Sequence, residues 1–140
     1  MDAVASDHPS VHTLRATVAR HGGRRRLDVT DPDDLLAPGV LRAVVDERTR
    51  FALVDAVGGD PAVVGLFETV RSASNRAFDR DRLAAWLEAA DRPPGRTVLV
   101  DVLEPGERIG LRRPGERATY PVAGAPTGPL ADIARSLEED

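Results

Sequence analysis

The stretch at residues 24–54, RRRLDVTDPDDLLAPGVLRAVVDERTRFALV, decides the fold. Its first segment alternates between outward arginine or aspartate and inward Leu27 and Val29, as a half-buried strand does. Its later part holds two valine-rich runs separated by a polar turn, which is typical of a hairpin. We therefore expect strands at 24–29, 40–45 and 50–57.

The residues between these strands predict a short helix. Asp31 can cap the unpaired amides, Pro32 fits the first helical position, and two further aspartates complement the positive end of the helix dipole. Pro38-Gly39 ends this helix near Leu36. The aspartates Asp31, Asp33 and Asp34 lack the alternating spacing and final Glu of a calcium loop, so we interpret them as capping residues.

The rest of the chain also predicts short strands separated by turns, with one longer helix. Residues 11–20 alternate, with His12, Leu14, Ala16 and Val18 on one face, and Gly22-Gly23 predicts the turn that follows them. Apolar residues recur at helical spacing in 81–90, namely Leu83, Trp86, Leu87 and Ala90. Further strands are expected at 62–67, 96–103, 109–111 and 117–122, with an irregular connection at 68–79.

The order of elements repeats: strand, helix, Pro-Gly and two further strands occur in each half. This order favours a compact barrel of six or seven strands, mainly β within the α+β class, with one short and one longer helix. We expect a disordered leader at 1–10, the barrel at 11–122, a flexible tether at 123–129 and an amphipathic helix at 130–140.

Residues 24–54 resemble the first half of a double-psi β-barrel, as found in the N-terminal subdomain of valosin-containing-protein-class AAA ATPases. The same run is similar to swapped-hairpin transition-state regulators, which implies DNA binding by a dimer through arginine-bearing strands. The whole chain resembles small uncharacterised proteins of halophilic archaea, through GRTVLVDVLEPGERIGLRRPGERATY and LADIARSLEED.

The basic residues are all arginine: the chain has 19 arginines, no lysine, and 23 acidic residues. A G/C-rich genome explains this bias, and it also suits a cytoplasm at high salt, where the Debye length falls to about 3 Å. No apolar run reaches the roughly 20 residues that span a bilayer. Without cysteine there is no disulfide or thiolate site, and we expect a cytoplasmic protein.

Two arginine runs are the candidate anion- or nucleic-acid-binding residues: Arg24, Arg25 and Arg26, and Arg112 with Arg113. Guanidinium forks bind phosphate in a bidentate manner. The alternative is an exposed strand whose arginines pair with nearby carboxylates, since the net charge is −4. A dimeric DNA-binding regulator would place both runs on one face.

Catalytic motifs are missing from the sequence: it has no nucleophile elbow, phosphate-binding loop or dinucleotide fingerprint. Ser72 and Ser74 lie in the 68–79 connection, which an enzyme could use as a lid, but no histidine follows them in the sequence. His8 and His12 have a spacing that ligates metals on helices, but Pro9 lies between them and no third ligand is evident. We expect no catalytic residue, metal or cofactor.

The C-terminal residues carry an apolar helical face formed by Leu130, Ile133 and Leu137. Such a helix can dock on its own barrel or enter a partner's groove. The sequence thus predicts a non-catalytic binding module for a protein or an anionic ligand, with DNA binding and an enzyme of unknown type as alternatives.

Overall fold

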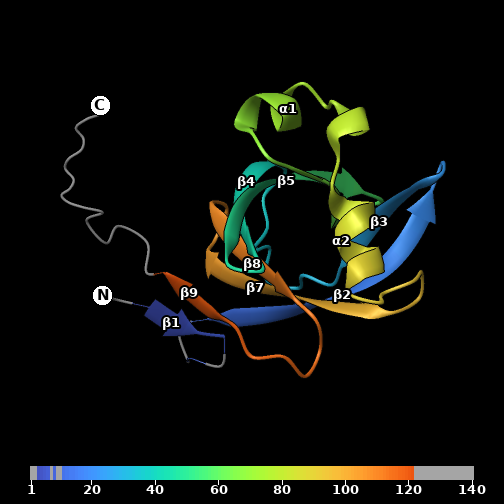
Figure 1. Cartoon of the computed structure of the whole chain (residues 1–140). Coiled ribbons are helices and arrows are strands. Elements are labelled where there is room, and N and C mark those ends of the chain that lie inside the picture. Colours follow the sequence, from blue (N-terminus) through green and yellow to red (C-terminus); the bar gives the residue numbers. More distant parts are fainter. Residues whose placement is uncertain (1–2, 7, 9–10, 122–140) are drawn as a thin grey trace.

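The alternating segments form a closed barrel in the computed structural model, which describes residues 3–6, 8 and 11–121 (Figure 1). Around the barrel the strands follow the order β2-β3-β6-β5-β4-β8-β7. Their bounds are β2 His12–His21, β3 Arg24–Val29, β4 Gly39–Val45, β5 Arg48–Val57, β6 Asp60–Phe67, β7 Thr97–Glu104 and β8 Arg108–Arg112. The expected mainly β barrel of six or seven strands is confirmed, and it has seven strands.

Neighbouring strands pair antiparallel, with the exception of β4 and β8, which run parallel. Two short strands, β1 Ala3–Ala5 and β9 Thr119–Pro121, form a separate antiparallel ribbon beside the barrel (Figure 1). The strand β1 lies within the segment expected to be a leader, and its backbone pairs with β9. The expected tether and C-terminal helix lie outside the described residues.

The barrel core follows from the period of two along each strand. In β2 the buried residues are Leu14, Ala16 and Val18, whereas His12 is exposed. In β3, Leu27 and Val29 point inward as expected. The ladder between β3 and β6 has two residue pairs, and α2 (Leu83–Ala89) packs against both strands there, adding Leu83 and Leu87 to the core.

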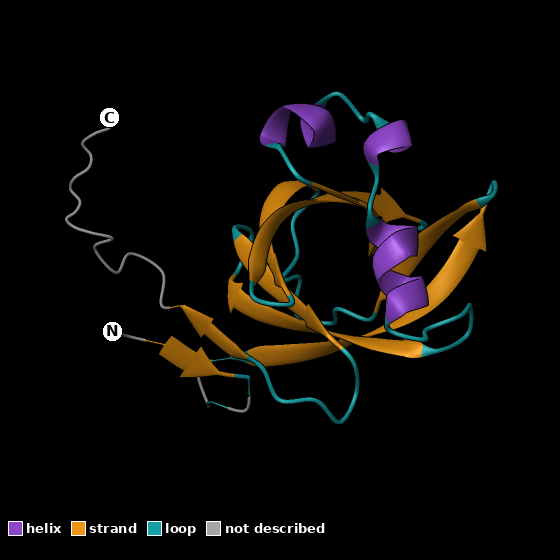
Figure 2. Cartoon of the chain, viewed as in Figure 1, coloured by secondary structure: helices purple, strands orange, loops and turns teal. Residues whose placement is uncertain are grey.

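A second apolar cluster lies on the outside of the barrel, beneath α1 (Val70–Ser74), which contacts β4, β5 and β6 and stands above the barrel in Figure 2. The 3-10 helix η1 (Phe78–Arg80) follows α1 and borders the same cluster. Leu53, Phe67 and Ala73 are its buried members, and Phe78 packs against them. Gly65 makes room for the Phe67 ring, since any side chain there would overlap that ring and would also contact Phe78. The 68–79 connection therefore covers the outer face.

The helix predicted at 31–36 is wrong. The chain turns at Asp34, whose φ of 53° lies in the left-handed region, so no helix begins. Asp31 nevertheless acts on backbone amides: its carboxylate accepts hydrogen bonds from Leu35 N at 2.9 Å and Leu36 N at 2.8 Å. A single aspartate thus closes a loop, and Leu36 enters the core.

The longer helix is confirmed as α2, and Asp81 fixes its start. One oxygen, Oδ1, accepts from Leu66 N at the end of β6 and from Leu83 N at the helix start, both at 2.8 Å. Burial raises the pKa of Asp81, although the two backbone hydrogen bonds and the charge of Arg24 oppose that shift. Ionisation of Asp81 therefore weakens the folded state.

We expect Asp81→Asn to increase the free energy of unfolding at pH 7, because Asn keeps the Oδ1 acceptor and has no charge to desolvate. The wild-type protein loses stability as the pH rises through the raised pKa of Asp81, so the gain of the variant should shrink as the pH falls below that value. Urea unfolding of both proteins between pH 3 and 7 measures this difference. A less stable variant at pH 7 would contradict it.

No helix in the described part of the chain is long and apolar enough to cross a membrane.

Candidate functional site

The Arg24–Arg26 run lines a pocket of about 310 Å³ on the outer surface of the barrel. A fourth arginine, Arg76, reaches the same pocket from the turn after α1. We call this the arginine pocket; its lining residues are Arg24, Arg25, Arg26, Asp55, Ala56, Val57, Val64 and Arg76. Arginines from β3 and from the α1–η1 turn therefore line one concave surface.

Phe78 orders the cations. The Arg24 guanidinium lies 3.7 Å from the centre of the Phe78 ring, and that of Arg76 lies 5.5 Å from it. The ring is itself fixed, because it packs against Phe67 with the two centres 6.0 Å apart. A cation over an aromatic face is attracted by the ring quadrupole. The outer apolar cluster thus holds two positive charges close together.

Two of the four arginines have carboxylate partners. Arg76 binds Asp55 through both nitrogens, Nη1 at 3.1 Å and Nη2 at 2.6 Å, and Arg26 pairs with Asp28 at 2.8 Å. The hydrogen bond from Arg76, followed by the charges of Arg76 and Arg24, lowers the pKa of Asp55. Within the described residues, Arg24 and Arg25 form no ion pair, so the pocket carries excess positive charge.

The backbone at Arg76 is unusual for an arginine. The α1 helix ends in a Schellman motif, in which Ala77 N binds Ser72 O and Arg76 N binds Ala73 O. The motif places Arg76 at a φ of 53°, where glycine is normally preferred. A side chain at this position costs about 1 kcal/mol relative to glycine, and here that side chain reaches the arginine pocket.

The second arginine run lies elsewhere. Arg112 ends β8, which β7 and β2 separate from β3 around the barrel. Its Nε donates to Asp101 at 2.7 Å and its Nη1 to the Glu116 carbonyl at 2.6 Å. Arg113 pairs with the Glu116 carboxylate. The structure therefore brings Arg24–Arg26 together with Arg76 and not with Arg112 and Arg113.

Asp101 is the centre of a buried polar network. The carboxylate is fully buried in β7 and accepts from Thr13 Oγ1 at 2.6 Å, Arg112 Nε at 2.7 Å and the Tyr120 hydroxyl at 2.5 Å. Burial, followed by donation to Asp101, raises the pKa of Tyr120. The network links β2, β7, β8 and β9, so it fastens the β9 ribbon to the barrel wall.

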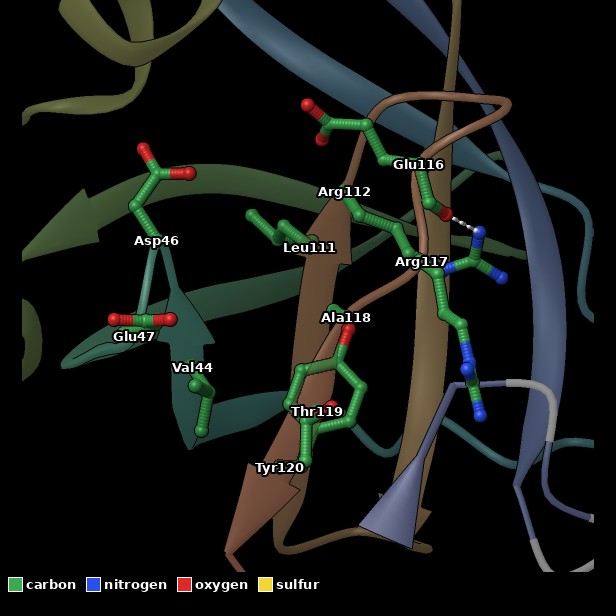
Figure 3. Close-up of a pocket in the computed structure, with 10 residues that line it drawn as sticks. All are labelled: Val44, Asp46, Glu47, Leu111, Arg112, Glu116, Arg117, Ala118, Thr119 and Tyr120. Atoms are coloured by element: carbon green, nitrogen blue, oxygen red, sulfur yellow. Dashed lines mark hydrogen bonds between the residues drawn. The ribbon is translucent and has the colours of Figure 1, made fainter.

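A larger cavity of about 490 Å³ adjoins this network (Figure 3). Val44, Leu111 and Tyr120 line it, and the carboxylates of Asp46 and Glu47, at the tip of the β4–β5 hairpin, stand on one side. The Arg112 and Arg117 side chains extend toward the opposite side. The cavity thus combines apolar and polar lining residues, with acidic groups at one rim.

The other candidate residues that the structure describes lie outside the arginine pocket. Ser72 lies in α1, where its amide and hydroxyl bind the Thr69 side chain at the helix start. His12 is exposed on β2. Among the described residues, no group of three histidine, cysteine, aspartate or glutamate side chains could hold a metal ion. Leu130, Ile133 and Leu137 lie outside the described residues.

Sequence reasoning missed three members of the arginine pocket region: Arg76, Asp55 and Phe78. Asp55 interrupts an apolar strand on its outward face, and Arg76 occupies the position after a short helix where glycine is usual. Both features can be seen in the sequence. Only the fold of the 68–79 connection, however, brings Arg76 to Asp55 and to the arginines of β3.

Comparison with known proteins identifies the family and no relative of known activity. The model of the family described as "Family of unknown function (DUF7112)" matches residues 1–137, and the chain belongs to that family. No curated protein and no solved structure matches this chain.

Proposed function

We propose that this member of a family without an assigned activity is a non-catalytic binding module that holds an anionic ligand in the arginine pocket. The observation that carries this proposal is that four arginines line one pocket, and that two of them, Arg24 and Arg25, form no ion pair with any residue that the structure describes. The Phe78 ring orders the Arg24 guanidinium before any ligand arrives, which lowers the entropic cost of binding.

The proposed setting is a cytoplasm at high salt, in line with the absence of lysine. Long-range attraction is screened over about 3 Å at molar ionic strength. A binding site in that setting must act through direct contact, and a pocket with several guanidinium forks suits such contact. We also propose descent from a double-psi barrel, which the closed barrel with its parallel β4–β8 pair supports.

We expect the double variant Arg24→Ala/Arg25→Ala to bind tripolyphosphate at least about tenfold more weakly than the wild-type protein, because each charge-assisted hydrogen bond contributes about 1.5–3 kcal/mol. Isothermal titration calorimetry at 0.15 M KCl measures the Kd. The matched control is Arg15→Ala/Arg96→Ala, which removes the same charge from exposed positions outside the pocket. Its affinity should change less than twofold.

Equal losses in the two double variants would contradict a defined site and indicate a general effect of net charge. A short DNA duplex serves as the second ligand. The DNA-binding alternative, a dimer using both arginine runs, requires an affinity that falls with salt by a log–log slope of about −0.9 per phosphate contacted. It also requires that Arg112 and Arg113 variants weaken binding.

A further inference from the structure

The arginine pocket contains its own counter-ion. Asp55 presents a carboxylate to the fork of Arg76 in the bidentate geometry that guanidinium forms with carboxylate and phosphate alike. Both partners are partly open to solvent, with 49% of the Arg76 side chain and 34% of the Asp55 side chain exposed. An incoming anion can therefore reach the pair.

We propose, resting on the proposed anion-binding function, that the pocket receives the terminal phosphate of a small phosphomonoester, which replaces Asp55 on the Arg76 fork. Asp55 then acts as an internal competitor that occupies the fork while the site is empty. The ligand must bring more negative charge than one carboxylate to displace it.

The charge of the pocket favours a phosphomonoester. Among the described residues, the Arg24 guanidinium forms no ion pair. Release of Arg76 adds a second guanidinium, which lies over the same Phe78 ring. A phosphomonoester carries about 1.5 to 2 negative charges at neutral pH and three acceptor oxygens, whereas a carboxylate carries one charge and two oxygens. The phosphate thus gains more than a carboxylate does from the guanidiniums of Arg24 and Arg76.

The size and lining of the pocket favour a small molecule. Its volume of about 310 Å³ is at the lower end of small-molecule sites, which span about 300–1,000 Å³. Ala56, Val57 and Val64 supply an apolar wall beside the guanidiniums. This wall can contact the body of a ligand whose phosphate lies among the arginines.

The left-handed backbone at Arg76 provides a clean way to remove its side chain. Glycine suits a φ of 53° better than arginine does, so Arg76→Gly should keep the fold while it removes the fork. Asp91 offers a matched control: it follows α2 at a φ of 57° in the same motif, with Arg92 N bound to Leu87 O. Asp91 does not line the arginine pocket.

The experiment uses phenyl phosphate and benzoate, which share an aromatic ring and differ in the anion, titrated calorimetrically at 0.15 M KCl and pH 7.5. The wild-type protein should bind phenyl phosphate at least about tenfold more tightly than benzoate.

Asp55→Asn should tighten phenyl phosphate binding about tenfold, because it removes the competitor. Asp33→Asn, an exposed control with the same change in charge, should change the affinity less than twofold. Arg76→Gly should weaken binding about tenfold and Asp91→Gly should not.

Each contrary result overturns the inference in a recognisable way. Equal affinity for benzoate and phenyl phosphate removes the preference for phosphate and leaves the anion-binding function standing. Unchanged or weaker binding in Asp55→Asn removes the role of Asp55 as a competitor. Failure of the wild-type protein to bind both phenyl phosphate and tripolyphosphate removes the anion-binding function itself. Thermal unfolding of each variant verifies that it is folded before titration.

Discussion

Asp101→Ala is expected to lower the free energy of unfolding by about 3–5 kcal/mol, the usual result of removing one member of a buried charged pair. The variant takes the acceptor from the Tyr120 hydroxyl, which is buried, and from Arg112 Nε and Nη2. It also leaves Thr13 without its bond between β2 and β7. Urea unfolding at pH 7, followed by far-ultraviolet circular dichroism, measures the loss.

The matched control is Asp55→Ala, which breaks an ion pair with Arg76 at the surface. Both side chains of that pair are at least one-third exposed, and exposed pairs contribute about 0–1 kcal/mol. If Asp101→Ala lowered the free energy of unfolding as little as Asp55→Ala, solvent would have to reach the network and supply the missing hydrogen bonds. Such a result would contradict the buried arrangement around Tyr120.

Gly110→Ala is expected to lower the free energy of unfolding by about 2–3 kcal/mol, since forcing extra atoms into a packed interior has a cost of this order. A side-chain carbon at Gly110 would overlap the Tyr120 ring and hydroxyl. The ring would have to move, and the hydrogen bond to Asp101 would lengthen or break. Chemical unfolding of the variant measures the loss.

A double-mutant cycle identifies the cause of that loss. In a Tyr120→Ala background the ring is gone, so adding Gly110→Ala should cost less than about 1 kcal/mol. Additive losses would mean that the glycine is required by the backbone of β8 and not by the ring. The coupling between the two positions therefore reports directly on how β9 packs against the barrel.

The strands were predictable because their physical signal is local. Alternation placed Leu27 and Val29 inside β3, and the boundaries of β3 match the prediction. The prediction of a helix at 31–36 was wrong for a local reason that the residue types alone do not reveal. The capping signal of Asp31 is real, but its carboxylate closes a loop around a left-handed Asp34 instead of starting a helix.

The candidate site was predictable only in part. The Arg24–Arg26 run was visible as a cluster of charge, whereas its pocket partners depend on contacts between distant segments. Arg76 and Phe78 reach β3 because the outer apolar cluster around Phe67 folds the 68–79 connection over β6. Arg112 was grouped with Arg24 by residue type, and the buried Asp101 holds it on another part of the barrel instead.

The seam between β2 and β7 has a consequence for the order of folding events. It joins His12 to Val102 and Thr13 to Asp101, so the barrel closes only when segments from opposite ends of the described chain meet. Closing so long a loop is entropically costly, and folds dominated by such distant pairings reach the native state in milliseconds to seconds. The hairpin β4–β5 and its neighbour β6 can form early from nearby residues. During synthesis, the edge of β2 that pairs with β7 therefore stays unpaired until β7 has left the ribosome.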